Sequence, residues 1–80
     1  MLLEIVTPDK AVFKGEVKLV RFPGSLGSFA TLKNHAPIIS TLQKGTLKTI
    51  DMEGEEDFFD IGGGVMEMNK NHIIVLAENA

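Results

Sequence analysis

The sequence predicts an all-β fold, a flattened two-sheet β-sandwich of short, mostly antiparallel strands. Two observations predict it: turn signals recur at short intervals, and the apolar runs between them alternate with period two. The turn signals lie at Pro8-Asp9, Gly15, Pro23-Gly24, Lys44-Gly45, Glu53-Gly54, Gly62-Gly63-Gly64 and Asn69-Lys70-Asn71. No linker, repeat or low-complexity segment divides the pattern, so residues 1–80 are expected to form one domain.

The expected strands follow one another from the N-terminus. Residues 2–6 form a nearly continuous apolar run, and so do residues 73–77, as in strands that are covered on both faces or that lie inside a sandwich. Between these two runs, apolar residues alternate with polar ones, which indicates strands with one inward and one outward face. The alternating sets are Val17 and Leu19 around Lys18, Phe59 and Ile61 around Asp60, and Met66 and Met68 around Glu67.

The only helix candidate is the segment of residues 37–44. Ile38, Ile39 and Leu42 could share one face of a helix there. However, the segment is under three turns long and rich in β-branched residues, which favour strands. It is therefore predicted to be a strand.

The composition is that of an ordinary globular domain. Hydrophobic residues make up 44% and charged residues 24% of the 80 residues, and a folded chain of this mass exposes about 4,700 Å². Cysteine is absent, which excludes disulfides and thiolate metal sites and suits a reducing compartment. The longest uncharged stretch, residues 22–32, contains Pro23 and is too short for a spanning helix of about 20 residues. No basic region precedes an apolar core at the N-terminus, so no secretory signal is expected.

The net charge of −3 is unevenly distributed along the chain. Residues 1–50 hold seven basic and three acidic side chains, whereas residues 51–80 hold one basic and eight acidic ones. Nucleic-acid binding is not expected, because Trp and Tyr are absent and the five Phe are scattered. Two rival functions are disfavoured: a small nucleic-acid-binding barrel, by the acidic half and the missing aromatic platforms, and a sandwich that binds a sugar or another small ligand, by the lack of Trp and Tyr.

No catalytic, cofactor or metal site is predicted. His35 and His72 have no Cys, Asp or Glu at ligand spacing, so a zinc site lacks donors. Ser25 and Ser28 lie outside any G-x-S-x-G motif, and serines in turns commonly serve local hydrogen bonding. We therefore expect a protein that is not an enzyme.

Two further patterns have structural interpretations. Residues 62–64 are all glycine and precede an expected strand, so a bulge or tight turn with close backbones is favoured over a phosphate loop. The acidic run around Gly54 fails the spacing of a calcium loop and is interpreted as a solvated hairpin tip. Its members are Asp51, Glu53, Glu55, Glu56 and Asp57.

Two segments are candidate interaction sites. Residues 22–29 place Phe and Leu in a turn where the local pattern requires no core contact, and exposed apolar loop residues often mark an interface. The alternative is that Leu26 and Phe29 fold back onto the sandwich. Residue identity favours a simple turn histidine at His35. However, Pro37 pushes Ala36 into extended geometry and so fixes how the His35 ring is presented to a partner.

A series of short motifs runs through the chain. In order they are Pro23-Gly24-Ser25-Leu26-Gly27-Ser28-Phe29, Asn34-His35-Ala36-Pro37-Ile38-Ile39, Lys44-Gly45, Gly63-Gly64-Val65-Met66-Glu67 and Val75-Leu76-Ala77-Glu78. At these separations the motifs together resemble the N-terminal domain of the ATP synthase epsilon chain, over the whole chain. The sequence departs from that family at Ala30, where glycine is usual, and at Lys33, where proline is common.

The resemblance implies a non-catalytic subunit of the central stalk, or rotor, of the F-type ATP synthase, without a cofactor. It implies docking on the gamma subunit and the c-ring, which couples proton translocation to ATP synthesis, and no nucleic-acid partner. Membrane contact is expected only through the complex, peripherally, at the cytoplasmic face of the energy-transducing bacterial plasma membrane. The loop expected to face the c-ring comprises Gly24, Ser25, Leu26, Gly27, Ser28 and Phe29. The residues expected to face gamma are Thr7, His35, Ala36, Pro37, Ile38 and Ser40.

Longer members of that family continue after the V-L-A-E strand into two C-terminal helices. Those helices carry the inhibition of ATP hydrolysis and, in some members, ATP binding. The 80 residues end at Ala80 without such helices, so neither activity is expected of them. The expected architecture is the family's β-sandwich domain alone.

Overall fold

The computed structural model describes residues 1–80 and consists of six β-strands joined by turns and short loops. The strands are β1 (Leu2–Val6), β2 (Ala11–Phe22), β3 (Phe29–Leu32), β4 (Ile38–Asp51), β5 (Glu56–Asn69) and β6 (His72–Ala77). The all-β prediction is therefore confirmed. The helix candidate is also strand, as expected, because β4 begins at Ile38 and runs through it.

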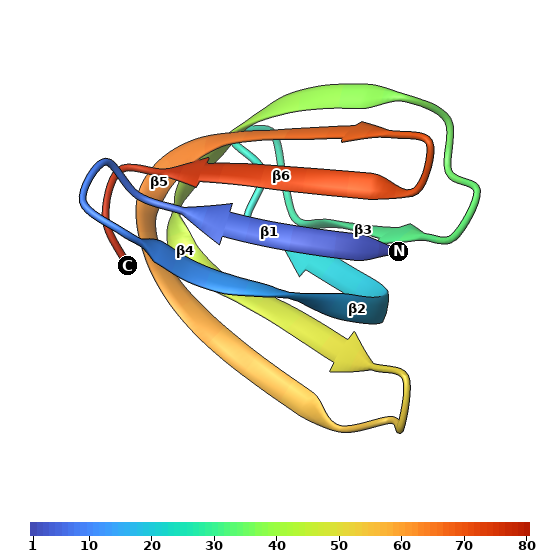
Figure 1. Ribbon diagram of the computed structural model, residues 1–80. Helices are drawn as coiled ribbons and strands as arrows, with labels where there is room; N and C mark the ends of the chain where they lie inside the picture. Colours follow the sequence, from blue (N-terminus) through green and yellow to red (C-terminus); the bar gives the residue numbers. More distant parts are fainter.

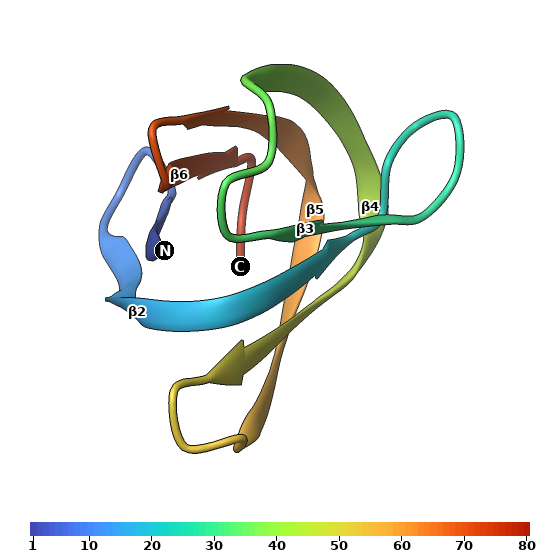
Figure 2. The same cartoon turned by 90° about the vertical axis from the view of Figure 1, so that its right-hand side faces the viewer.

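The strands close on themselves into a flattened, barrel-like sandwich (Figure 1, Figure 2). The hydrogen-bonded order is β1-β6-β5-β4-β2-β3, and β1 also pairs with β2, which joins the ring. All pairs are antiparallel except β1 with β6, which run parallel with Leu2 opposite His72 and Val6 opposite Leu76. This parallel pair is possible because the whole of the intervening chain crosses from one strand to the other.

The long strands β2, β4 and β5 bend, so that each contributes residues to both layers of the sandwich. β2 pairs with β1 through residues 11–16 and with β3 and β4 through residues 17–22. β5 pairs with β6 through residues 64–69, and with the far half of β4 through residues 56–62. The two-layer prediction holds, but β2, β4 and β5 have 12, 14 and 14 residues and are longer than the short strands expected.

The three consecutive glycines of β5 lie where that strand bends. A Cβ atom on Gly64 would collide with the carbonyl oxygen of Leu76, and one on Gly62 would collide with the side chain of Asn79. Gly63 and Gly64 also have φ angles of 110° and 151°, which L side chains rarely adopt. The expected close approach of backbones at residues 62–64 is therefore confirmed. The expected bulge or tight turn is wrong, because these residues lie inside β5 and keep an unbroken register with β4.

The other turn signals have mixed outcomes. Gly54, with φ of 88°, lies in the turn between β4 and β5, and Lys70 and Asn71 form the turn between β5 and β6. The turns expected at Gly15 and at Lys44-Gly45 are wrong, because these residues lie inside β2 and β4. Lys44 pairs with Gly62 of β5, and the two strands bend together at this point. The chain therefore changes direction there without leaving the sheet.

One hydrophobic core fills the space between the layers. Its buried members are Met1, Leu3, Ile5, Val17, Val20, Phe22, Leu42, Leu47, Ile61, Met66, Met68, Ile73, Val75 and Ala77. Phe13 and Phe59 pack against this cluster, with their ring centroids 5.3 Å apart. The total accessible surface of 4798 Å² agrees with the value expected for a folded chain of this mass. The strands therefore form a packed scaffold from which the loops project.

Candidate functional site

The Leu26 loop, residues 23–28, connects β2 to β3 and is hydrogen-bonded to β4. Gly24 forms an isolated bridge with Leu42, and the Ser25 amide donates to the Thr41 carbonyl at 3.1 Å. Within the loop, the Gly27 amide donates to the Gly24 carbonyl at 3.0 Å. A Cβ atom on Gly24 would lie 2.5 Å from the Gly27 carbonyl oxygen, so this tight turn requires glycine. Residues 25–28 are exposed, whereas Gly24, which was expected to face a partner, is buried. The loop is held firmly against the sheet.

The two apolar side chains of this region have different environments. Leu26 lies at the tip of the loop with a relative exposure of 104%, as open to solvent as in an extended chain. Phe29 is half-buried and stacks on the core residue Phe22, with ring centroids 5.2 Å apart. Figure 2 shows the loop between β2 and β3 projecting from the sandwich. Leu26 is therefore available to a partner, whereas Phe29 belongs to the core.

The His35 segment, residues 33–37, joins β3 to β4 and is exposed throughout. The His35 amide donates to the Leu32 carbonyl at 3.2 Å, and the ring Nδ1 lies 2.7 Å from the Ala36 carbonyl oxygen. The ring contact is a hydrogen bond only when Nδ1 carries a proton, so in the neutral ring Nε2 is an acceptor. His35 is thus an exposed turn histidine whose ring is oriented by its own backbone.

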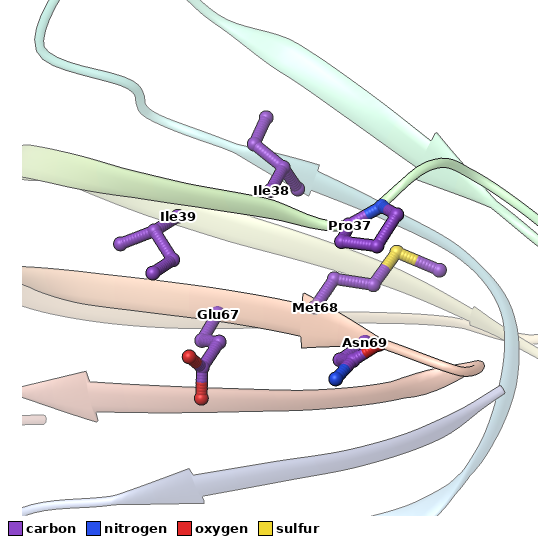
Figure 3. A pocket seen from close by; sticks show the side chains of 6 residues that line it. All are labelled: Pro37, Ile38, Ile39, Glu67, Met68 and Asn69. Atoms are coloured by element: carbon purple, nitrogen blue, oxygen red, sulfur yellow. The ribbon is translucent and has the colours of Figure 1, made fainter.

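Strand parity decides which residues of β4 face outward after this segment. Ile38 packs against the core and Ser40 is half-buried, whereas Ile39 between them is 70% exposed. The residues predicted to face gamma include Ile38 and Ser40 but not Ile39. Because successive side chains alternate, a buried Leu42 would have identified Ile39 as outward-facing. Figure 3 shows Ile39 near Glu67 of the neighbouring strand β5, beside a hollow of about 340 Å³.

An apolar strip crosses the outer face of the same layer. Val65 of β5 and Leu76 of β6 are exposed, and the register places Val65 opposite both Leu76 and Thr41. Ile39 lies in the adjacent row. The apolar run of β6 was expected to be covered on both faces or to lie inside a sandwich. Its inner face is buried in the sandwich at Ile73 and Val75, and its outer face at Leu76 is open. Grouped exposed aliphatic side chains of this kind are typical of an interaction surface.

The Leu26 loop and the start of β4 border a common hollow of about 560 Å³. Its lining residues are Gly24, Leu26, Gly27, Ser28, Phe29, Ile39, Ser40 and Thr41. Ile39 also lines the smaller hollow beside Glu67. The two candidate segments, which are separate in the sequence, therefore adjoin in the fold through the first residues of β4.

Thr7 lies away from the His35 segment. Its amide donates to the Lys10 carbonyl at 2.9 Å in the turn between β1 and β2. In Figure 1 this turn, in blue, and the connection from β3 to β4, in green, lie at opposite ends of the sandwich. The structure therefore does not bring Thr7 beside His35. Thr7 instead follows Val6, which is opposite Leu76 at the end of the apolar strip.

A small polar cluster around Glu4 lies on the outer face where β1, β2 and β6 meet. Glu4 accepts a hydrogen bond from His72 Nε2 at 3.2 Å, and its other carboxylate oxygen lies 3.4 Å from Lys14 Nζ. The hydrogen bond from His72, followed by that from Lys14, lowers the pKa of Glu4. No group of three or more His, Cys, Asp or Glu is arranged to hold a metal ion.

The acidic run forms the tip of the β4–β5 hairpin. The Oδ1 atom of Asp51 accepts hydrogen bonds from the amides of Glu53 and Glu55, both at 2.9 Å. These bonds stabilise the turn, so the interpretation of a hairpin tip is confirmed. The chain contains no helix of the length and apolarity needed to span a membrane.

Comparison with known families identifies relatives of this fold. The family model described as "ATP synthase, Delta/Epsilon chain, beta-sandwich domain" matches residues 1–80. The ATP synthase epsilon chain of Chlorobaculum tepidum is 42% identical over 76 residues, which are 95% of this chain and 86% of that protein. The epsilon chain of Bordetella petrii is 35% identical over 78 residues, which are 98% of this chain and 55% of that protein. The chain thus spans about half the length of some relatives and most of the length of others.

Two solved structures contain chains of the same fold. One is a chain of the Euglena gracilis mitochondrial ATP synthase, in a structure of OSCP, F1 and the c-ring, with a TM-score of 0.90 and 22% identity. The alignment covers 96% of this chain and 49% of that one. The other belongs to the central stalk and c-ring of the Tetrahymena thermophila mitochondrial ATP synthase, with a TM-score of 0.80, 14% identity and coverage of 98% and 63%. These likenesses show a shared β-sandwich.

Proposed function

The chain belongs to the ATP synthase delta/epsilon family of β-sandwich domains, and from this premise we propose that it is a non-catalytic rotor subunit of an F-type ATP synthase. It docks on the gamma subunit and on the c-ring, and so helps to couple proton translocation to ATP synthesis elsewhere in the complex. It contacts the membrane only through the complex, at the cytoplasmic face of the energy-transducing bacterial membrane.

The observation that carries this proposal is the similarity to the epsilon chain of Chlorobaculum tepidum. The 42% identity extends over 86% of that protein, so a domain like this one makes up nearly all of a relative with that name. A central-stalk role is therefore compatible with a chain that consists of the β-sandwich and little else.

The geometry of the two candidate segments supports the assignment of partners. The Leu26 loop offers an exposed apolar tip to the c-ring, and the His35 segment with Ile39 offers a ring and an aliphatic side chain to gamma. Segments held by a rigid sheet lose little conformational entropy when they dock. Two contacts of about 800 Å² each, the usual size per partner, would cover about a third of the 4798 Å² surface.

Leu26→Asp and His35→Asp test these assignments. Both residues are exposed and lie outside the core, so both variants should fold and melt like the wild type. Leu26→Asp should weaken binding to the c-ring, and His35→Asp should weaken binding to gamma, in native-gel titrations with the purified partners. Met52→Asp is the matched control, because Met52 is an exposed apolar residue on the distant β4–β5 hairpin.

The outcomes separate the sites from the function. If both variants assemble as the wild type does, the two segments are not the docking sites. If the wild-type chain binds neither gamma nor the c-ring at micromolar concentration, the proposed rotor function itself is wrong.

A further inference from the structure

Asn34 and Asn71 connect two turns that are 37 residues apart in the sequence. The Asn34 amide donates to Oδ1 of Asn71 at 2.7 Å, and Nδ2 of Asn71 donates to Oδ1 of Asn34 at 3.1 Å. We call this pair the Asn clasp. The other hydrogen bonds of the His35 segment are local, so the clasp ties that segment to a distant part of the chain.

The backbone at both ends of the clasp is unusual. Asn34 has a φ of 66° and Asn71 a φ of 63°, in the left-handed region that asparagine tolerates better than most residues. Asn71 is itself anchored, because its carbonyl oxygen accepts the Leu2 amide at 2.9 Å. The turn that holds Asn71 joins β5 to β6, two strands of the packed sandwich. The His35 segment is therefore tied to a fixed point of the scaffold.

We propose that the Asn clasp is a positioning device that holds the His35 segment in the geometry in which it docks on the gamma subunit. This inference rests on the proposed function. Asn34 directly precedes His35, so loss of the clasp would let the segment sample many conformers before docking. Docking would then have to order the segment, and the entropy lost in doing so would weaken the complex.

Asn34→Gly and Asn71→Gly remove the two amide side chains without straining the backbone, because glycine adopts positive φ readily. Lys70→Gly is the matched control, since Lys70 is exposed, has a φ of 52° in the same turn as Asn71 and takes no part in the clasp. Hydrogen exchange of the His35 amide, which donates to the Leu32 carbonyl, should become faster in both clasp variants and stay unchanged in the control.

Affinity for the purified gamma subunit is then measured by titration well below the melting temperature. Asn71→Gly removes both hydrogen bonds of the clasp and should weaken binding about fivefold. Asn34→Gly keeps the backbone donor of residue 34 and should weaken binding less, and Lys70→Gly should leave it unchanged. Combined with His35→Ala, Asn71→Gly should cause little further loss, because both changes act through the same segment. A clasp that only stabilised the fold would lower the melting temperature and leave affinity unchanged.

Failure of this inference differs from failure of the proposed function. If the wild type binds gamma and Asn71→Gly binds equally well, the positioning role is overturned while the rotor function stands. The same holds if the fivefold loss persists in full when His35 is already alanine. If the wild type does not bind gamma at all, the rotor function and the docking role both fall. Unchanged exchange of the His35 amide would also overturn the clasp as a tether.

Discussion

Replacing Thr31 by valine should make the protein more stable. The side chain of Thr31 faces the core from β3 with 0% exposure, and its hydroxyl oxygen has no hydrogen-bond partner. Val20 of β2 is its cross-strand neighbour and is also buried. Valine has the same branched shape as threonine, so the exchange replaces an unpaired hydroxyl by a methyl group of similar size.

The cost of the unpaired hydroxyl sets the size of the effect. Leaving a buried polar group without a partner costs about 1–3 kcal/mol, so Thr31→Val should raise the free energy of unfolding by about 1–2 kcal/mol. Unfolding entropy is about 2.1 cal/mol/K per residue, or about 0.17 kcal/mol/K for a chain of 80 residues. The melting temperature should therefore rise by about 6–12 °C.

Thermal and urea unfolding, followed by circular dichroism, measure this change. Thr46→Val is the control, because Thr46 is exposed and its hydroxyl donates to Asp60 Oδ1 at 2.7 Å. There the same exchange removes a hydrogen bond, and stability should stay the same or fall by about 1 kcal/mol. A Thr31→Val variant that melts at or below the wild-type temperature would refute the argument that the buried hydroxyl is a net cost.

Three further predictions concern the bend of β5, the polar cluster around Glu4 and the apolar strip. Gly64→Ala should lower the free energy of unfolding by more than about 3 kcal/mol or prevent folding, because the new Cβ would meet backbone atoms. In the control Gly54→Ala the new Cβ lies in open space, so urea unfolding should show a loss of only about 1 kcal/mol. Similar losses at both sites would contradict the close approach. His72→Ala should return the pKa of Glu4 toward 4.5 in an NMR titration, since the hydrogen bond from His72 is the main cause of its lowering. A carboxyl group whose pKa is lower in the folded than in the unfolded state stabilises the folded protein above the unfolded pKa, and this stability is lost as pH falls through the folded pKa. Below pH 4.5 the wild type should therefore lose more stability than His72→Ala. Equal acid sensitivity of the two proteins would contradict the pairing of Glu4 with His72. Ile39→Asp should keep the melting temperature and weaken gamma binding about tenfold, and unchanged titration curves would remove Ile39 from the docking surface.

Local sequence patterns predict the layers of this fold but not the lengths of its strands. Alternation at residues 66–68 indicates the inward and outward faces correctly, because strand parity is a local property. The glycines at residues 62–64 permit a tight turn as readily as a bend within a strand. Only their pairing with β4 on one side and β6 on the other decides between these outcomes. That pairing joins residues far apart in the sequence, so the residues at 62–64 alone do not predict it.

The same local patterns predict part of the candidate site. Leu26 was a candidate because nothing nearby in the sequence calls for an apolar residue there, and it is exposed. Ile39 was missed because parity along β4 depends on which residues reach the core, a fact that one short segment does not reveal. The Asn clasp was missed for a stronger reason: Asn34 and Asn71 each fit an ordinary turn, and their contact exists only in three dimensions.

Both proposed docking segments are attached to one strand, β4. The Leu26 loop is bonded to it through the Ser25 amide and the Thr41 carbonyl, and the His35 segment runs directly into Ile38. From Ile38 to Ile50 this strand pairs with β5, so it cannot shift alone. In the proposed rotor, a force on the c-ring-facing loop therefore reaches the gamma-facing segment through a close-packed, hydrogen-bonded sheet and not through a flexible linker. Loosening either attachment to β4 should impair coupling even where each partner still binds.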